Sequence, residues 1–251
     1  MDNILEEEKK FQDSKVTSSV RAGYYAFYKD NKETLAHINN HLNGVSGKIL
    51  VLGCGDVDIT LLSKYKFNQI VGIDISPESV KKINLFIKNK GLGDKIKCFV
   101  MDAHNLEFSD KEFDIIFGTG ILHHLNIEKA SEEMRRVLKD NGEIIFMEPL
   151  GINPVLNWHR KRTPEARTEF EHPLRSKDFK TIKKYFSIST KGFYLFTILS
   201  FGFKTIIKSD FLYKISRLAL SGLDMLLLSV LPLDYLCWIT IIEGKKRNLT
   251  V

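Results

Sequence analysis

Cysteine is scarce in this 251-residue sequence: three cysteines are present, at positions that form no obvious pair. An odd, unpaired set excludes a disulfide framework and favours a reducing compartment. The amino terminus has acidic residues at 6–8 and no apolar core, so we expect no signal peptide and a cytoplasmic location. The chain also has no internal repeat, low-complexity tract or glycine-serine linker. We therefore expect a single domain over residues 1–251.

Neither sign of charge dominates the composition. The sequence is 43% hydrophobic and 27% charged, as in a globular protein, with a net charge of +6 and a pI near 9.0. Such a mild excess could favour nucleic acid or an anionic membrane, but an ordinary basic surface explains it equally simply. We find no Asn-Pro-Pro-Tyr-type base-flipping motif and no appended RNA-binding domain, so we do not expect a nucleic-acid partner.

An apolar run at 49–52 leads directly into a glycine turn at Gly53 and Gly55. An uninterrupted apolar run is typical of a central parallel strand, because helices cover both of its faces. The two glycines let the backbone turn sharply and let a ligand lie close against it. Asp74 ends a second apolar run, where a carboxylate can accept hydrogen bonds from both hydroxyls of a ribose. This combination predicts a nucleoside ligand.

The glycine turn does not complete a dinucleotide-binding motif. In G-x-G-x-x-G the third glycine lets a helix N-terminus approach a pyrophosphate, but here that position holds Asp58. A carboxylate there would repel a phosphate, so NAD and FAD are disfavoured.

Strand and helix patterns alternate over the next hundred residues. Ser76 and Pro77 predict the start of a helix, residues 96–101 a third strand and residues 113–118 a fourth. A helix over 128–139 follows. The sequence Asp-Asn-Gly at 140–142 predicts a turn into a fifth strand at 143–147. This order favours right-handed βαβ units and a parallel sheet.

The motifs at 45–150 resemble, in this order, those of class I S-adenosylmethionine (SAM) methyltransferases of the Methyltransferase-11 type, which act on small molecules. The resemblance extends more weakly to residue 173. It implies a Rossmann-like, doubly wound α/β sheet of seven strands, six parallel and one antiparallel. Two positions depart from the family pattern: Val51 replaces an acidic residue, and Val57 replaces a glycine.

The resemblance implies SAM as cofactor and assigns residues to it. Gly53 and Gly55 would accommodate the methionine end, Asp74 the ribose, and Asp102 with Ala103 the adenine. Gly118 would lie behind the methionine part. The complete set of predicted cofactor-binding residues is Gly53, Cys54, Gly55, Asp74, Ile75, Asp102, Ala103 and Gly118.

Candidate catalytic residues follow the fourth and fifth strands, at the edge where α/β proteins bind ligands. They are His124, Glu148 and His172. His172 is a possible general base in a polar segment that also contains Arg162 and Arg167, but a salt-bridged surface loop would have the same composition. We expect no metal site, because no other histidine or cysteine near His123 and His124 has metal-ligand spacing.

The expected organisation is a helical amino-terminal cap (1–44), a SAM-binding core (45–150), a substrate-loop region (151–185) and a hydrophobic helical insertion (197–236). The insertion separates the last two strands, predicted at 186–196 and 237–242. It could form a lid on an apolar pocket, an in-plane membrane-surface helix or a homodimer interface. Core packing would explain most of its leucines equally well.

The sequence therefore predicts a methyltransferase acting on a small molecule that could be lipophilic, at an oxygen, nitrogen or carbon acceptor. The alternative is a methyltransferase-like binding or scaffold protein with weak catalysis, which Val51 and Val57 motivate.

Overall fold

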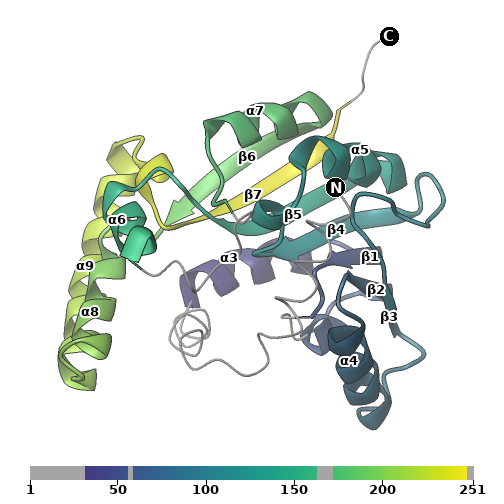
Figure 1. The fold of residues 1–251 in the computed structure, drawn as a ribbon, viewed down its shortest axis with the longest axis horizontal. Coiled ribbons are helices and arrows are strands. Elements are labelled where there is room, and N and C mark those ends of the chain that lie inside the picture. Colours follow the sequence, from purple (N-terminus) through teal and green to yellow (C-terminus); the bar gives the residue numbers. More distant parts are fainter. Residues whose placement is uncertain (1–31, 56–58, 163–171, 248–251) are drawn as a thin grey trace.

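The computed structural model describes residues 32–55, 59–162 and 172–247. These residues form a seven-stranded sheet of order β3-β2-β1-β4-β5-β7-β6 (Figure 1). The strands are β1 (Gly47–Leu52), β2 (Phe67–Asp74), β3 (Ile96–Val100), β4 (Phe113–Thr119), β5 (Leu138–Pro149), β6 (Phe186–Phe193) and β7 (Ile239–Lys246). β7 runs antiparallel to β5 and β6, whereas the other neighbouring strands are parallel. The predicted α/β sheet, with six parallel strands and one antiparallel strand, is confirmed.

Helices cover both faces of the sheet. α3 (Lys32–Asn43) and α4 (Pro77–Asn89) lie on one face, and α5 (Ile127–Val137) and α7 (Ser176–Tyr185) lie on the other (Figure 1). The remaining described helices are η2 (Ile59–Lys64), η3 (Leu122–His124), α6 (Pro154–Arg162), η5 (Thr197–Leu199), α8 (Ser200–Thr205), α9 (Asp210–Val230) and η6 (Asp234–Leu236), where η marks a 3-10 helix.

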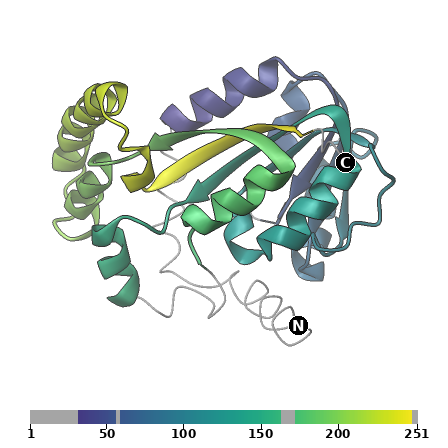
Figure 2. The same cartoon turned by 90° about the horizontal axis from the view of Figure 1, so that it is seen from above.

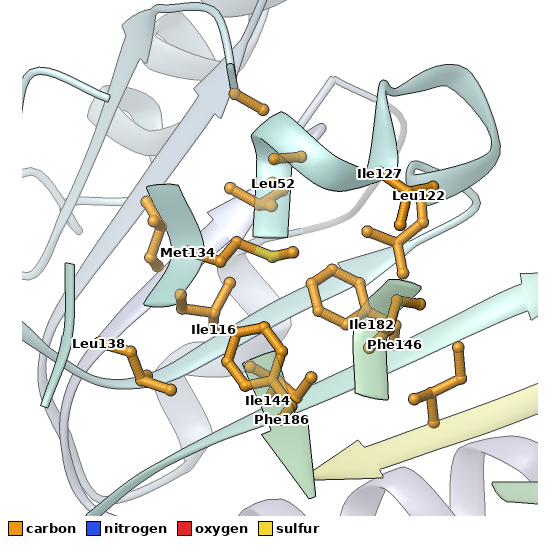
Figure 3. Close-up of a cluster of buried hydrophobic side chains, with 14 of the residues drawn as sticks. Leu52, Ile116, Leu122, Ile127, Met134, Leu138, Ile144, Phe146, Ile182 and Phe186 are labelled. Atoms are coloured by element: carbon orange, nitrogen blue, oxygen red, sulfur yellow. The ribbon is translucent and has the colours of Figure 1, made fainter. Parts of the chain in front are cut away.

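The central strand β1 contributes to the core on both faces. Ile49 and Val51 pack in the layer that includes side chains of α3 and α4. Leu50 and Leu52 pack in the opposite layer with side chains of α5 and α7, part of which Figure 3 shows. Because both layers are closed, every position of this run is buried, which explains why the sequence shows no polar alternation there.

The start of α4 follows the predicted capping pattern. The Ser76 hydroxyl accepts a hydrogen bond from the Ser79 N–H at 3.1 Å, and Pro77 occupies the first helical turn. Val80 and Ile87 on the inner face of α4 are buried. The sequence pattern therefore placed the start of this helix.

One expectation about local structure was wrong. Residues 140–142 form no turn: β5 begins at Leu138 and continues through them, and Gly142 does not have a positive φ. Phe113 of β4 pairs with Leu138 but Ile115 pairs with Glu143, so β5 takes up the extra residues as a bulge. The expected substrate-loop region, 151–185, contains helices α6 and α7.

The insertion between β6 and β7 is helical, as predicted. It consists of η5, α8, α9 and η6, which together form an arm beside the sheet (Figures 1 and 2). α8 and α9 pack against one another, and both contact η5. The division of the chain into a cap, a core, a substrate region and an insertion within one domain stays a prediction.

Candidate cofactor and acceptor site

The turn after β1 requires glycine at its first position. Gly53 has a φ of +66°, and a Cβ there would lie 2.9 Å from Cδ1 of Ile121. The next residue, Cys54, is buried, and its N–H donates to the carbonyl of Ile73 on β2 at 2.9 Å. The turn is therefore tied to the neighbouring strand. Cys54 contributes a small buried side chain to it.

Gly55 and Asp74 are joined directly. The Gly55 N–H donates to Oδ2 of Asp74 at 2.8 Å, and a Cβ on Gly55 would lie 2.6 Å from that oxygen. Oδ1 of Asp74 accepts the N–H of Ser76 at 2.9 Å. Ile75, between them, is half-buried. A carboxylate has about four acceptor positions, which suits a vicinal diol as well as backbone donors. Asp74 also takes up a backbone donor that a phosphate would otherwise use.

A second carboxylate lies at the end of the next strand. The N–H of Met101 donates to the carbonyl oxygen of Asp74 at 3.0 Å, which places Asp102 beside the end of β2. Oδ1 of Asp102 accepts both the N–H of His104 at 2.9 Å and its Nδ1–H at 2.7 Å. The described residues donate no hydrogen bond to Oδ2, so this oxygen can accept one from an exocyclic amine. Ala103 is buried beneath this turn.

His104 is a positioning residue that the sequence did not predict. Its Nε2 accepts the N–H of Asn126 at 2.9 Å, which leaves the Nδ1 proton for Asp102. Burial raises the pKa of Asp102, but the hydrogen bonds from the side chain and backbone of His104, together with the charge of Lys129, outweigh burial and hold the pKa below its usual range. Asp102 is therefore a fixed, ionised acceptor.

Gly118 has a packing role in the structure. A Cβ there would lie 2.7 Å from Cγ2 of Ile121 and 2.7 Å from Cε1 of Phe146. The low bulk of Gly118 therefore accommodates Ile121 and Phe146, and its expected place behind the methionine part of the cofactor stays a prediction. Packing against Ile121 and Phe146 is sufficient to explain this glycine.

Glu148, a predicted catalytic residue, is fully buried at the carboxyl end of β5. Oε1 accepts the N–H groups of Ile121 and Leu122 at 2.9 and 2.8 Å, and Oε2 lies 2.7 Å from Nδ1 of His123. Glu148 therefore holds the start of η3 and orients His123. We interpret Glu148 as a positioning residue, because its carboxylate is enclosed by these donors.

The other two candidate catalytic residues, His124 and His172, lie near Glu148 and His123. His124 is half-buried, and its ring centroid lies 4.2 Å from that of His123. The N–H of His172 donates to the carbonyl of His123 at 3.1 Å, while its Nε2 is 3.7 Å from Oδ1 of Asp178. The structure therefore brings His124 and His172 to one region at the carboxyl ends of β4 and β5.

Three residues named in the sequence analysis lie outside the described residues, namely Val57, Asp58 and Arg167. Within the described ranges, no group of three or more His, Cys, Asp or Glu side chains is arranged to hold a metal ion. Two surface hollows lie away from the site. One is beside α4 and β3, around Asn84 and Phe99. The other is at the amino-terminal ends of β1, β4 and β5, around Asp114 and Lys139.

The sheet order and the two acids beside a glycine turn are features that the resemblance to class I methyltransferases predicted. Residues 50–146 match the family model of the methyltransferase domain. The predicted resemblance is confirmed over this segment.

Curated relatives match the same part of the chain. A demethylmenaquinone methyltransferase of Bacteroides fragilis is 33% identical over 97 residues, which are 38% of this chain and 40% of the relative. A ubiquinone/menaquinone biosynthesis C-methyltransferase of Citrifermentans bemidjiense is 33% identical over 111 residues, which are 43% of this chain and 47% of the relative. The chain thus covers less than half of each relative.

Solved structures share the fold over most of the chain. A geranyl diphosphate C-methyltransferase of Streptomyces coelicolor, in complex with Mg²⁺, geranyl diphosphate and S-adenosylhomocysteine, has a TM-score of 0.61 at 12% identity. The match covers 86% of this chain and 81% of that one. The [4+2]-cyclase SpnF has a TM-score of 0.58 at 17% identity, covering 85% and 80%. Because one of these neighbours is a cyclase, the shared fold alone does not fix the reaction.

Proposed function

We propose that the protein binds SAM and transfers its methyl group to a small molecule. One observation carries this proposal: two carboxylates stand at neighbouring strand ends beside a glycine turn whose Gly55 N–H is already bonded to Asp74. This arrangement suits an adenosine without phosphates. The matched methyltransferase segment, residues 50–146, supports the choice of SAM over other nucleosides.

The described residues fit the cofactor at three points. Asp74 would accept the ribose hydroxyls, and Oδ2 of Asp102 the adenine amine. The turn at 53–55, where a Cβ on either glycine would clash with the protein, would lie against the methionine end. When bound, the cofactor would supply an electrophilic methyl group on a sulfonium.

At the acceptor end, the proposed reaction is an in-line displacement. An oxygen, nitrogen or carbon of the acceptor would take the methyl group, and the electron pair of the methyl–sulfur bond would stay on the sulfur. Where the acceptor must lose a proton, His124 or His172 would accept it. The main contribution of the protein would be alignment of donor and acceptor and exclusion of water.

The acceptor is proposed to be apolar. Relatives named for menaquinone and ubiquinone synthesis, and a structural neighbour that binds geranyl diphosphate, support a lipophilic acceptor. The proposal places the protein in the cytoplasm, because Cys54, Cys98 and Cys237 are free thiols.

Calorimetry with S-adenosylhomocysteine tests cofactor binding without knowledge of the acceptor. We expect micromolar affinity for the native protein and a loss of about 100-fold or more in Asp74→Ala, because two hydrogen bonds to a charged group contribute about 3 kcal/mol or more. Glu78→Ala is the matched control: it removes an exposed carboxylate on the first turn of α4, close to Asp74 in sequence, and should leave affinity unchanged.

The alternative function is a methyltransferase-like binding or scaffold protein. Val51, where the family has an acidic residue, is fully buried in the core and offers no polar group to the turn. Absence of heat at millimolar S-adenosylhomocysteine, in a protein that is folded by circular dichroism, would favour this alternative and reject the enzyme.

A further inference from the structure

The arm formed by residues 197–236 leaves the sheet at the edge where the candidate site lies. It follows the carboxyl end of β6, where Phe193 pairs with Ile239, and Ile239 pairs in turn with Pro149 of β5. From there α8 and α9 extend beyond the sheet (Figures 1 and 2). The arm and the ends of β4 and β5 therefore belong to one side of the molecule.

The longest helix of the arm, α9, turns its apolar residues outward. Leu218 is 76% exposed and Met225 is 75% exposed. Large apolar residues are also exposed along the rest of α9, namely Phe211, Leu212, Ile215, Leu223, Leu226 and Val230. Helices on water-exposed surfaces normally place charged residues there. On this face the only charged side chains are at the first turns of the helix, so α9 is inverted relative to a helix that faces water.

Polar contacts fix this rotation of α9. In its first half, Arg217 Nη2 lies 3.0 Å from Oε2 of Glu33 on α3. In its second half, the buried Asp224 accepts hydrogen bonds from the N–H groups of Phe196 and Thr197 at 2.7 and 3.1 Å, and from the Thr197 hydroxyl at 2.7 Å. Because both polar residues have partners on the protein, the opposite face must point away from it.

Charge around the apolar face is mainly positive. Lys208 and Lys214 are exposed at the start of α9, and Lys204 lies over the ring of Tyr213 at 4.8 Å. Among residues 199–233 the only exposed carboxylate is Asp210, because Asp224 is buried. An apolar helix face with lysines at its margin complements an anionic lipid surface.

A lipid surface fits this face better than a second copy of the chain. Protein interfaces combine apolar contact with about one hydrogen bond per 100–200 Å². The exposed face of α9 offers few polar side chains beyond its first turns, chiefly Ser229. No helix in the described part of the chain is long and apolar enough to cross a bilayer. The geometry therefore suits a helix lying in the plane of the interface.

We propose that the outward face of α9 docks the protein on an anionic membrane, with the helix lying in the lipid headgroup region. Docking would hold the carboxyl edge of the sheet at the bilayer. If the proposed function is correct, an apolar acceptor would then reach the site directly from the lipid phase. The docking itself requires no catalysis.

Vesicle flotation of the full chain tests the docking surface. We expect the protein to float with vesicles of phosphatidylcholine and phosphatidylglycerol, and more weakly with phosphatidylcholine alone. Leu218→Ser combined with Met225→Ser should lower binding by more than about tenfold, because two large apolar contacts are lost. Lys208→Gln combined with Lys214→Gln should lower binding to the anionic vesicles by about tenfold or more, at roughly fivefold per lysine.

The matched control is Leu61→Ser combined with Leu85→Ser. These leucines are 61% and 60% exposed on η2 and α4, outside the arm, and their loss should leave vesicle binding unchanged. Circular dichroism checks that each variant is folded. Calorimetry with S-adenosylhomocysteine is performed separately, so failure of docking and failure of the proposed function are distinguishable.

Two results would overturn the proposal. One is that the native chain does not float with anionic vesicles, or floats equally well after the α9 substitutions. The other is a dimer in sedimentation velocity that Leu218→Ser with Met225→Ser converts to monomer while vesicle binding is absent. That result would assign the face to a second copy of the chain.

Discussion

Glu148 allows a quantitative test of how the carboxyl ends of β4 and β5 are held together. Its buried carboxylate accepts hydrogen bonds from Ile121 and Leu122 at 2.9 and 2.8 Å, and it lies 2.7 Å from Nδ1 of His123. Each of these donors is enclosed by the loop that follows β4. If the carboxylate is removed, water has little access to replace it.

The expected cost follows from the unsatisfied donors. A buried donor left without a partner costs about 1–3 kcal/mol, so Glu148→Ala, which removes the partner of three donors, should lower the free energy of unfolding by about 3–9 kcal/mol. This is a large part of the 5–15 kcal/mol typical of a domain. Glu148→Gln should cost less, about 1–3 kcal/mol, because its amide oxygen can still accept both backbone N–H groups. Its amide N–H groups would face Nδ1 of His123, which must then change tautomer.

Urea unfolding followed by circular dichroism measures both losses, with equal m-values as the check on two-state behaviour. Glu143→Ala is the control on the same strand. Glu143 is partly exposed and contacts Lys245 at 3.2 Å and His41 at 3.1 Å, so its loss should cost less than about 1 kcal/mol. The reasoning fails if Glu148→Ala is as stable as the Glu143 variant, or if Glu148→Gln is no better than Glu148→Ala.

Two further predictions concern the cofactor side. Ser76→Ala should lower the free energy of unfolding in urea by about 1 kcal/mol, because it removes the N-cap of α4. Ser79→Ala should leave this free energy nearly unchanged, because Ser79 contributes only its backbone N–H to the cap. The lowered pKa of Asp102 means that its stabilising contribution is complete above the ordinary aspartate pKa of about 3.9, and is lost as the pH falls through the lowered value. Asp102→Asn should therefore make stability decline less steeply with acid below about pH 4; equal slopes for the two proteins would refute this assignment.

The fold and the cofactor side follow from local patterns in the sequence. The apolar run of β1 and the spacing from Gly55 to Asp74 require only neighbouring parallel strands, and Gly55 N–H meets Asp74 in the structure. The role of His104 in orienting Asp102 could not be predicted from such local patterns. Its role depends on the N–H of Asn126, which belongs to the start of α5 and approaches only in the folded chain.

Glu148 shows why the position of a residue in the fold does not by itself predict its role. The rule that ligands bind at the carboxyl ends of strands placed it near the acceptor. Side chains alternate along a strand, however, so Glu148 shares its direction with Ile144 and Phe146, both of which belong to the buried layer beneath α5 and α7. Continuing that alternation by one step predicts a buried carboxylate, which must then have donors around it.

The orientation of α9 depends on the partners of its polar residues. Its sequence has an apolar stripe and a polar stripe, and a stripe of leucines normally faces the core. Here the Asp224 carboxylate bonds to Phe196 and Thr197, and Arg217 bonds to Glu33, so turning the leucines inward would expose both contacts to water and break them. An apolar stripe therefore shows that a helix needs an apolar environment. Only the partners of its polar stripe show whether that environment is the protein's own core or something outside it.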